Sequence, residues 1–437
     1  MKKFSALILI LALILSLSGC EMRSAPAPTA SPTPTTAATA TPEPTATPEP
    51  TPEPTPTPEP TPEPTPTPEP PAKELTDLMT LSDSFGSRVQ LIQDGDRNTF
   101  LEYNGNAVIH LSSPENIYGV YLVWYAYPAP FKILSGGSEQ TGGAYGFYHE
   151  YIYLDDPGAE VDIALEGYGQ LAEIRSFGQG TPPPDVQVWQ PPCEKADVLV
   201  FAAHADDDVI FFGPLIAQSV DRGLTVQVCY LVDHGMKGGV IWTGRTHELL
   251  DAQWTMGITN YPIIGPFPDY YILSLQEALQ SFGEQNVIGY QVEMLRRFKP
   301  WVAVGHDREG EYGHGAHRIT SLCLEQAVAL AGDPASFPES AQAWGAWNTP
   351  KLYLHFADEN QIVLDVETPL EHFGGKTAYE VAWEAMMFHE SQLIYAHRPT
   401  LYTDDENFWR YDCRKFGLVR TMVGADTGND IMEHIEY

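Results

Sequence analysis

The stretch that decides the fold is Asp197-Val198-Leu199-Val200-Phe201-Ala202, followed directly by Ala203-His204-Ala205-Asp206-Asp207-Asp208. The first run is mostly apolar and predicts a strand buried on both faces, and the second lies where that strand ends and a helix is expected to begin. His204 and Asp207 stand three residues apart across this turn, so both side chains can reach one point in space. An imidazole and a carboxylate together suit Zn²⁺, which takes nitrogen and oxygen ligands. Helix capping accounts for one aspartate here, but not for three behind a histidine.

A second polar stretch, residues 306–317, follows the run Trp301-Val302-Ala303-Val304, which predicts another buried strand. Sites in open α/β sheets form beyond the carboxyl ends of the strands, so this stretch is expected on the same sheet edge as His204. His314 and His317 are three residues apart at a predicted helix start, hence on one face of that helix. The glycines around them let the backbone approach closely. Two histidines at this spacing indicate a site rather than isolated core or surface residues.

Strand-like runs alternate with helix-like runs over residues 191–437, and this alternation predicts an α/β fold with a parallel sheet. A further strand is expected over residues 225–232. The expected helices cover residues 209–221, 245–256, 287–298 and 317–331.

Residues 203–208 resemble the Ala-His-Pro-Asp-Asp-Glu signature of the PIG-L/LmbE deacetylase family, and residues 314–317 resemble that family's His-Pro-Asp-His. The resemblance covers roughly residues 195–395, with both motifs in the family's order and in the expected strand–helix context. Ala205 and Asp208 replace a proline and a glutamate of the signature. Gly315-Ala316 replaces Pro-Asp, so Ala316 offers no carboxylate to a neighbouring histidine.

The resemblance implies a Rossmann-like, zinc-dependent N-deacetylase domain with one Zn²⁺ per chain, held by His204, Asp207 and His317. Three protein ligands leave a fourth position for water, as in catalytic zinc sites. The resemblance makes Asp206 the general base, and protonated His314 the residue that stabilises the oxyanion or assists the leaving amine. The implied reaction removes the acetyl group from an N-acetylglucosamine-type sugar or glycoconjugate.

Three further residues are candidates for substrate binding: Arg245, Asp269 and His389. Arg245 and Glu248 resemble the family's Arg-x-x-Glu, and an arginine there can grip a sugar diol or a phosphate. The alternative is an i,i+3 ion pair between these two side chains. Residues 389–392 resemble a late family segment near the pocket mouth, with a surface turn as the alternative. Asp269 lies in an apolar and aromatic loop that can contact substrate.

Residues 73–190 alternate turn residues with short β-rich runs, which predicts a β-sandwich; the runs include residues 108–111, 119–124, 151–154 and 161–165. Residues 94–99 and 177–180 resemble segments of discoidin-like (coagulation factor 5/8 type C) modules of the galactose-binding fold. That resemblance implies carbohydrate or surface binding. The alternative is a structural domain packed on the enzyme, in which Asp94 and Asp96 only form a turn.

The N-terminus is predicted to be a lipoprotein signal peptide over residues 1–20. Lys2 and Lys3 precede an apolar run that is short for a spanning helix, which needs roughly 20 residues. The run ends in Leu17-Ser18-Gly19-Cys20, which resembles a bacterial lipobox. This resemblance implies a lipid anchor at Cys20, on the outer face of a bacterial cytoplasmic membrane. Residues 21–72 form a linker rich in Pro, Thr and Glu, and its prolines favour polyproline II.

The net charge of −34 disfavours nucleic acid and anionic lipid as partners, and an uncharged glycan or a cationic partner fits better. Cys193 and Cys413 can pair outside the cell, and the sequence leaves that pairing open. The combined prediction is an exported, lipid-anchored, zinc-dependent N-deacetylase. Two alternatives stay open: an amidase acting on another N-acyl group, and a catalytically inactive glycan-binding surface lipoprotein. The sequence leaves the exact substrate, the native metal and the oligomeric state undecided.

Overall fold

The computed structural model describes residues 69–84, 88–126, 128–237, 240–241, 244–393 and 411–436, with only the backbone of residues 236, 237, 240, 241 and 393. The predicted signal peptide, Cys20 and nearly all of the predicted linker lie outside the described residues. Thr67–Tyr437 form one compact unit. Among the described ranges, none of the helices is both long enough and apolar enough to cross a membrane.

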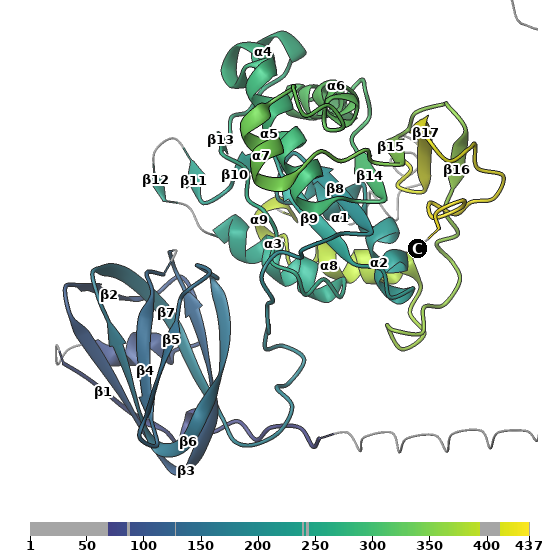
Figure 1. Ribbon diagram of the computed structural model, residues 1–437. Helices are drawn as coiled ribbons and strands as arrows, with labels where there is room; N and C mark the ends of the chain where they lie inside the picture. Colours follow the sequence, from purple (N-terminus) through teal and green to yellow (C-terminus); the bar gives the residue numbers. More distant parts are fainter. Residues whose placement is uncertain are drawn as a thin grey trace, which may run out of the picture. The chain divides into compact units, whose positions relative to one another are not determined.

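The first part of the described chain is an antiparallel sheet with the strand order β2-β7-β3-β6-β4-β5, in which β1 pairs with β3 (Figure 1). The strands are β1 (Thr80–Asp83), β2 (Leu101–Asn104), β3 (Ala107–Trp124), β4 (Phe131–Ser135), β5 (Ser138–Gly142), β6 (His149–Leu165) and β7 (Tyr168–Phe177), with the short 3-10 helices η1 (Thr76–Leu78) and η2 (Val89–Ile92). Its inward-facing apolar side chains form a core of their own. The β-rich character is as predicted, and the two-sheet sandwich stays a prediction.

The four short strands expected between residues 108 and 165 belong to two long strands. β3 includes both 108–111 and 119–124, and β6 includes both 151–154 and 161–165. The two strands pair along most of their length, with register shifts between Ser112 and Gly119. These irregularities let a strand bend without leaving the sheet, so its polar middle resembles a turn in the sequence.

Asp94 and Asp96 form a turn, as the structural alternative for this part expects. The Asp94 carboxylate accepts hydrogen bonds from the backbone N–H of Asp96 (2.9 Å) and the hydroxyl of Thr99 (2.7 Å). The Asp96 carboxylate accepts one from the backbone N–H of Asn98 at 3.0 Å. Such local side-chain to backbone bonds stabilise a turn, so both aspartates have a structural role.

The second part of the chain contains a six-stranded sheet with the order β16-β17-β15-β14-β8-β9. Its strands are β8 (Val198–Ala202), β9 (Val226–Tyr230), β14 (Val302–Gly305), β15 (Lys351–His355), β16 (Gln361–Val363) and β17 (Lys415–Thr421). The neighbours β9, β8, β14 and β15 are parallel, as predicted, but β17 runs antiparallel to both β15 and β16. The sheet is therefore mixed, because an antiparallel strand can extend the edge of a parallel sheet.

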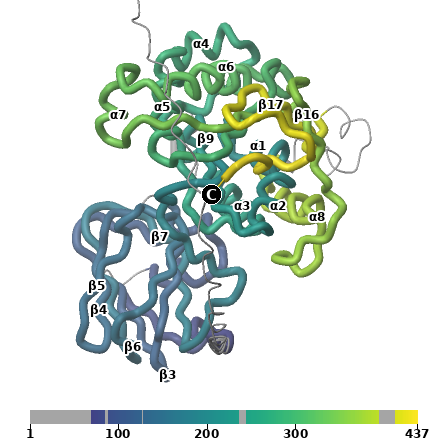
Figure 2. Tube along the Cα trace, turned by 45° about the vertical axis from the view of Figure 1, so that its right-hand side comes forward, coloured from purple at the N-terminus to yellow at the C-terminus, as the bar shows by residue number. Residues whose placement is uncertain are grey.

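Helices cover both faces of this sheet, and β8 shows why. Val198, Val200 and Ala202 pack into one core with residues of α1 (Asp207–Ile210), α2 (Gly213–Asp221), α3 (Gly244–Thr255) and α8 (Ala378–Met386). Leu199 and Phe201 pack into a second core with residues of α4 (Leu275–Phe282), α5 (Glu284–Phe298) and α6 (Gly315–Leu330). Figures 1 and 2 show these two groups of helices on opposite sides of the strands. Because β8 is buried on both faces, its sequence is one continuous apolar run.

The remaining elements are short. They are β10 (Val232–Asp233), which pairs with β13 (Phe267–Pro268), β11 (Met236–Lys237), which pairs with β12 (Val240–Ile241), the 3-10 helix η3 (Glu311–Gly313), α7 (Pro338–Trp344) and α9 (Glu390–Leu393).

The predicted helices are present, with one difference. The helix expected over residues 209–221 is two helices, because α1 ends at Ile210 and α2 begins at Gly213. Pro214 lies in the first turn of α2 and has no backbone N–H to donate to the preceding turn, so the helix breaks just before it.

The antiparallel part packs directly on α3. Phe147 and Tyr148 join the core that contains α1, α2 and α8. Arg97 forms an ion pair with Asp251 of α3, and a ring nitrogen of His149 lies 2.7 Å from one of His247. These contacts support the structural alternative for residues 73–190.

Candidate metal centre

The three residues predicted to hold a metal meet at the carboxyl end of β8. The chain turns at His204 after β8, and Asp207 is the first residue of α1. His317 comes from the first turn of α6, which follows the neighbouring strand β14. All three side chains are buried. The strand-end argument therefore places these residues correctly, although two of them are 113 positions apart.

The donor atoms of these residues form a nearly equilateral triangle. Nδ1 of His204 lies 3.1 Å from Oδ2 of Asp207 and 3.2 Å from Nε2 of His317, and Nε2 of His317 lies 3.3 Å from Oδ2 of Asp207. A tetrahedral zinc ion with bonds of about 2.0–2.1 Å requires ligand atoms about 3.3–3.4 Å apart. Two imidazoles and one carboxylate at this spacing fit zinc in both size and chemistry.

The charges at the triangle also suit a cation. Burial alone raises the pKa of Asp207, but His317 and His204 outweigh burial and hold that pKa well below its usual range. Burial lowers the pKa of His317, yet the carboxylates of Asp207 and Glu311 raise it to about 10. A proton on His317 thus balances the buried carboxylates, and a bound metal ion takes the place of such a proton.

Two further sets of possible ligands overlap the triangle of His204, Asp207 and His317. Donor atoms of Asp207, His306 and His317 lie within 4.8 Å of one another, as do those of His204, His314 and His317. In His306, however, Nε2 accepts a hydrogen bond from the backbone N–H of Ala203 at 3.0 Å, and Nδ1 bonds to Glu311 at 2.8 Å. Since both of its ring nitrogens are engaged, the geometry favours His204 over His306 as a ligand.

His314 lies beside the triangle and caps α6. Its Nδ1 accepts a hydrogen bond from the backbone N–H of Ala316 at 3.3 Å, and its ring meets that of His204 edge-on with centroids 4.6 Å apart. Burial, together with the nearby His204, lowers the pKa of His314 to about 3. The ring is therefore neutral at neutral pH, and the catalytic role predicted for a protonated His314 stays a prediction. With Nδ1 as acceptor, the neutral ring carries its proton on Nε2 and can donate it in a hydrogen bond.

Asp206 is paired with Arg245 beside the metal centre. Nη2 of Arg245 lies 2.7 Å from Oδ1 of Asp206, and Nη1 lies 3.4 Å from Oδ2 of Asp269. Burial alone raises the pKa of Asp206, but Arg245, together with His389 and His204, outweighs it and holds the pKa below its usual value. The structure thus brings two predicted substrate-binding residues, Arg245 and Asp269, together with the predicted base.

The expected partner of Arg245 along its own helix, Glu248, binds elsewhere. Its carboxylate accepts hydrogen bonds from the backbone N–H of Ser391 (2.7 Å) and from the Ser391 hydroxyl (2.6 Å). The i,i+3 ion pair considered for Arg245 is replaced by these contacts, which fasten α9 to α3.

His389 is buried, so the alternative of a surface turn at this position is wrong. Its exposed fraction is 0%, and neither ring nitrogen has a hydrogen-bond partner among the described residues. Nδ1 lies 4.0 Å from Oε2 of Glu248. Burial lowers the pKa of His389 to about 4, so the ring is neutral. A neutral, unpaired imidazole near Asp206 and Arg245 can bind a substrate hydroxyl, and that role stays a prediction.

Glu311 is a site residue that the motifs do not indicate. It is buried, and its carboxylate accepts hydrogen bonds from His306, His317 and His355. Its place in the sequence, six residues before His317 in the stretch that follows β14, is the signal that could have found it. The contribution of His355, 44 residues further on, depends on β15 lying next to β14.

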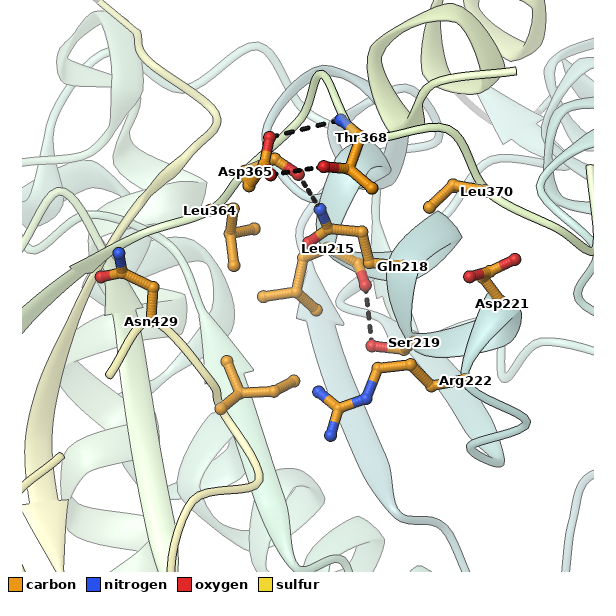
Figure 3. Close-up of a pocket in the computed structure, with 11 residues that line it drawn as sticks. Leu215, Gln218, Ser219, Asp221, Arg222, Leu364, Asp365, Thr368, Leu370 and Asn429 are labelled. Atoms are coloured by element: carbon orange, nitrogen blue, oxygen red, sulfur yellow. Dashed lines mark hydrogen bonds between the residues drawn. The ribbon is translucent and has the colours of Figure 1, made fainter. Parts of the chain in front are cut away.

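A pocket of about 230 Å³ lies apart from these residues, against α2 (Figure 3). Leu215, Leu364 and Ile431 are among its lining residues, and Gln218 is hydrogen-bonded to the backbone carbonyl of Asp365. Its one arginine, Arg222, is paired with Asp430. None of the predicted site residues is among the residues that line this pocket.

Part of the chain is similar to known deacetylases. Residues 199–328 match the PIG-L family, described as GlcNAc-PI de-N-acetylase. A 1D-myo-inositol 2-acetamido-2-deoxy-alpha-D-glucopyranoside deacetylase of Mycobacterium leprae is 28% identical over 37% of this chain and 59% of its own length. The enzyme of the same name from Rhodococcus erythropolis is 28% identical over 36% of this chain and 59% of its own length. The chain thus spans about three fifths of the length of these curated relatives.

Among solved structures, the N,N'-diacetylchitobiose deacetylase of Pyrococcus horikoshii is 19% identical, with a TM-score of 0.40 over 53% of this chain and 86% of its own. The segment that matches the PIG-L family contains the three metal-site residues, together with Asp206, Arg245, Asp269 and His314. His389 lies beyond it.

Proposed function

We propose that this chain is a zinc-dependent hydrolase that removes the N-acetyl group from an N-acetylglucosamine-type sugar or glycoconjugate. The observation that carries the proposal is the triangle of donor atoms from His204, Asp207 and His317, with the paired carboxylate of Asp206 beside it. This arrangement lies within the segment that is similar to deacetylases.

Asp206 is suited to act as the general base. When bound, Zn²⁺ supplies a Lewis acid that polarises the acetamide carbonyl and makes a water molecule acidic near neutral pH. Arg245 holds Asp206 in its ionised form, so the carboxylate can accept the proton of the attacking water. Arg245 also fixes the direction in which that carboxylate points.

His314 is suited to stabilise charge on the carbonyl oxygen. Its neutral ring donates from Nε2, because Nδ1 is occupied by the backbone N–H of Ala316. A fixed N–H donor stabilises an oxygen on which negative charge develops. The proton taken by Asp206 passes to the nitrogen as the C–N bond breaks, and the products are acetic acid and the amine, which at neutral pH are acetate and the protonated amine.

The first experiment measures zinc content and acetate release for the full chain and three variants. We expect about one zinc per chain in the wild type and loss of zinc in His317→Ala. Asp206→Asn should keep the zinc and lose turnover on N-acetylated sugars. Glu194→Gln is the control, because Glu194 is exposed. A wild type that takes up no zinc, or an Asp206→Asn variant with full turnover, would contradict the proposal.

The same assay separates the two alternatives. If N-acetyl sugars are inert but other N-acyl compounds are hydrolysed, the chain is an amidase of different specificity. If no amide is hydrolysed although zinc is bound, the inactive glycan-binding alternative takes its place.

We also propose that the protein acts at the outer face of a bacterial cytoplasmic membrane, anchored through Cys20. The sequence Leu17-Ser18-Gly19-Cys20 supports this proposal. Metabolic labelling with a radioactive fatty acid should mark the wild type and not Cys20→Ala. For residues 73–190 the contacts of Asp94, Asp96 and α3 favour a structural role, and glycan-array binding tests the carbohydrate-binding alternative.

A further inference from the structure

The carboxylate of Glu311 connects three histidines that come from three different elements. Oε2 accepts from Nδ1 of His317 and from Nδ1 of His306, each at 2.8 Å, and Oε1 accepts from Nδ1 of His355 at 2.7 Å. A fourth bond comes from the backbone N–H of Asp307 at 3.2 Å. Glu311 is 2% exposed, so this is a buried and fully used carboxylate.

The three histidines lie on separate parts of the sheet and its helices. His306 directly follows β14, His317 lies in the first turn of α6, and His355 is the last residue of β15. His355 is itself held, because its Nε2 lies 3.2 Å from the backbone carbonyl of Asp412. Glu311 therefore ties the start of α6 to two neighbouring strand ends.

Each hydrogen bond to Glu311 determines which nitrogen of the ring carries the proton. Because Nδ1 of His317 keeps its proton and donates it to Glu311, Nε2 is the nitrogen that gives up its proton to a metal ion, and this is the atom that lies on the donor triangle with His204 and Asp207. His306 is held in the same way, but its Nε2 is occupied by the backbone N–H of Ala203. Glu311 thus prepares His317 to bind a metal, whereas the backbone N–H of Ala203 keeps Nε2 of His306 from that role.

We propose that Glu311 is a positioning residue of the metal centre, which sets the affinity and the coordination geometry of the metal through His317. This inference rests on the proposed function in so far as it assumes that a metal binds at the triangle. A carboxylate behind a histidine ligand fixes the ring and raises its basicity, and loss of such a partner typically weakens metal affinity by about 10–100-fold. Glu311 supplies such a carboxylate to His317 from η3, just before α6 begins.

The test compares zinc affinity in Glu311→Ala, Glu311→Gln and a control. The control is Glu325→Gln, because Glu325 also lies on α6, is partly exposed and pairs with Arg308 outside the site. The zinc dissociation constant is measured on the full chain by competition with a chromophoric chelator. We expect Glu311→Ala to weaken binding by about 10–100-fold. Glu311→Gln should have an intermediate effect, because one amide oxygen can still accept from His317 and His306. Glu325→Gln should bind zinc as the wild type does.

Two further readouts separate positioning from a general structural effect. The visible spectrum of the Co²⁺-loaded protein reports coordination geometry, and we expect it to change in Glu311→Ala but not in the control. His306→Ala should still bind one metal ion per chain, since His317 keeps its bond to Glu311. If Glu311→Ala does not fold, the zinc affinity and the Co²⁺ spectrum of Glu311→Gln test the inference in its place.

A zinc dissociation constant within twofold of the wild type in the Glu311 variants would overturn the inference, even if their thermal stability falls. Loss of the metal in His306→Ala would also overturn it, because His306 would then be a ligand. Zinc binding that depends on Glu311, without any deacetylation, would uphold this inference and contradict the proposed function. A wild type that binds no zinc would contradict both.

Discussion

Nη2 of Arg245 lies 2.7 Å from Oδ1 of Asp206, and both side chains are buried. The two residues are 39 positions apart, on α3 and on the turn that follows β8. Because α3 is also the helix on which the antiparallel part of the protein packs, the position of Asp206, the proposed base, depends on packing outside the site. The ion pair therefore links the stability of the fold to the proposed chemistry.

Arg245→Met should strongly destabilise the metal-free protein, because it leaves a buried carboxylate without its cation. Loss of one partner of a buried ion pair costs about 3–5 kcal/mol of the free energy of unfolding. The double variant Arg245→Met/Asp206→Asn should lose less than the sum of the two single losses, with a coupling of roughly 0.5–3 kcal/mol. Urea unfolding of the wild type and the three variants measures this cycle. Additive losses would mean that the pair is not formed in solution.

Gly315→Ala should destabilise the protein more than Gly313→Ala. A Cβ atom on Gly315 would lie 2.3 Å from the backbone oxygen of Ser274, so the helix start would have to move. Overpacking of this kind costs about 1–3 kcal/mol. Gly313 has φ +73° but nothing within 4 Å of such an atom, so alanine there brings only backbone strain, about 1–2 kcal/mol. The melting temperatures of both variants are compared by thermal unfolding. Equal values would show that the backbone oxygen of Ser274 leaves room for a Cβ atom at position 315.

The stability of the protein should fall as the pH rises from about 4.5 to 7, in part because of Glu150. Burial raises the pKa of Glu150 to about 7 from an ordinary value of 4.5. In that range the unfolded chain loses the proton while the folded protein keeps it, which favours unfolding by up to roughly 3 kcal/mol. Glu150→Gln should remove this part of the pH dependence. The measurement is the difference in melting temperature between wild type and variant from pH 4 to 8, and a constant difference would contradict it.

Cys193 and Cys413 should not form a disulfide. The structure has all four described cysteines unpaired, and these two pack in different clusters of apolar side chains. Burial raises the pKa of each of the two thiols to about 12, so both should react slowly in the native state. Alkylation in denaturant without reductant, followed by peptide mass mapping, should find both modified. A cross-linked peptide containing both residues would show the opposite.

Much of the site could be predicted from the sequence because its residues lie at the ends of buried strands. His204, Asp207 and His317 meet where two neighbouring parallel strands end, as the pattern of apolar runs indicates. The helices expected from residues 209 and 317 begin two residues earlier, at Asp207 and Gly315, so the local pattern placed each helix start to within two residues. The spacing of apolar residues that indicates a strand or a helix repeats within a few neighbouring residues, so a short stretch of sequence is enough to recognise it.

Pairing between distant segments could not be predicted in this way. Three features depend on which segments become neighbours in the fold. They are the joining of four apolar runs into β3 and β6, the antiparallel direction of β17, and the pairing of Arg245 with Asp206 instead of Glu248. Glu311 is the clearest case, because its role requires His306, His317 and His355 to converge on one carboxylate. The sequence by itself determined which residues stand at the strand ends. Only the tertiary structure decided which of them share a hydrogen bond, because that choice depends on distances set by the packing of the whole sheet.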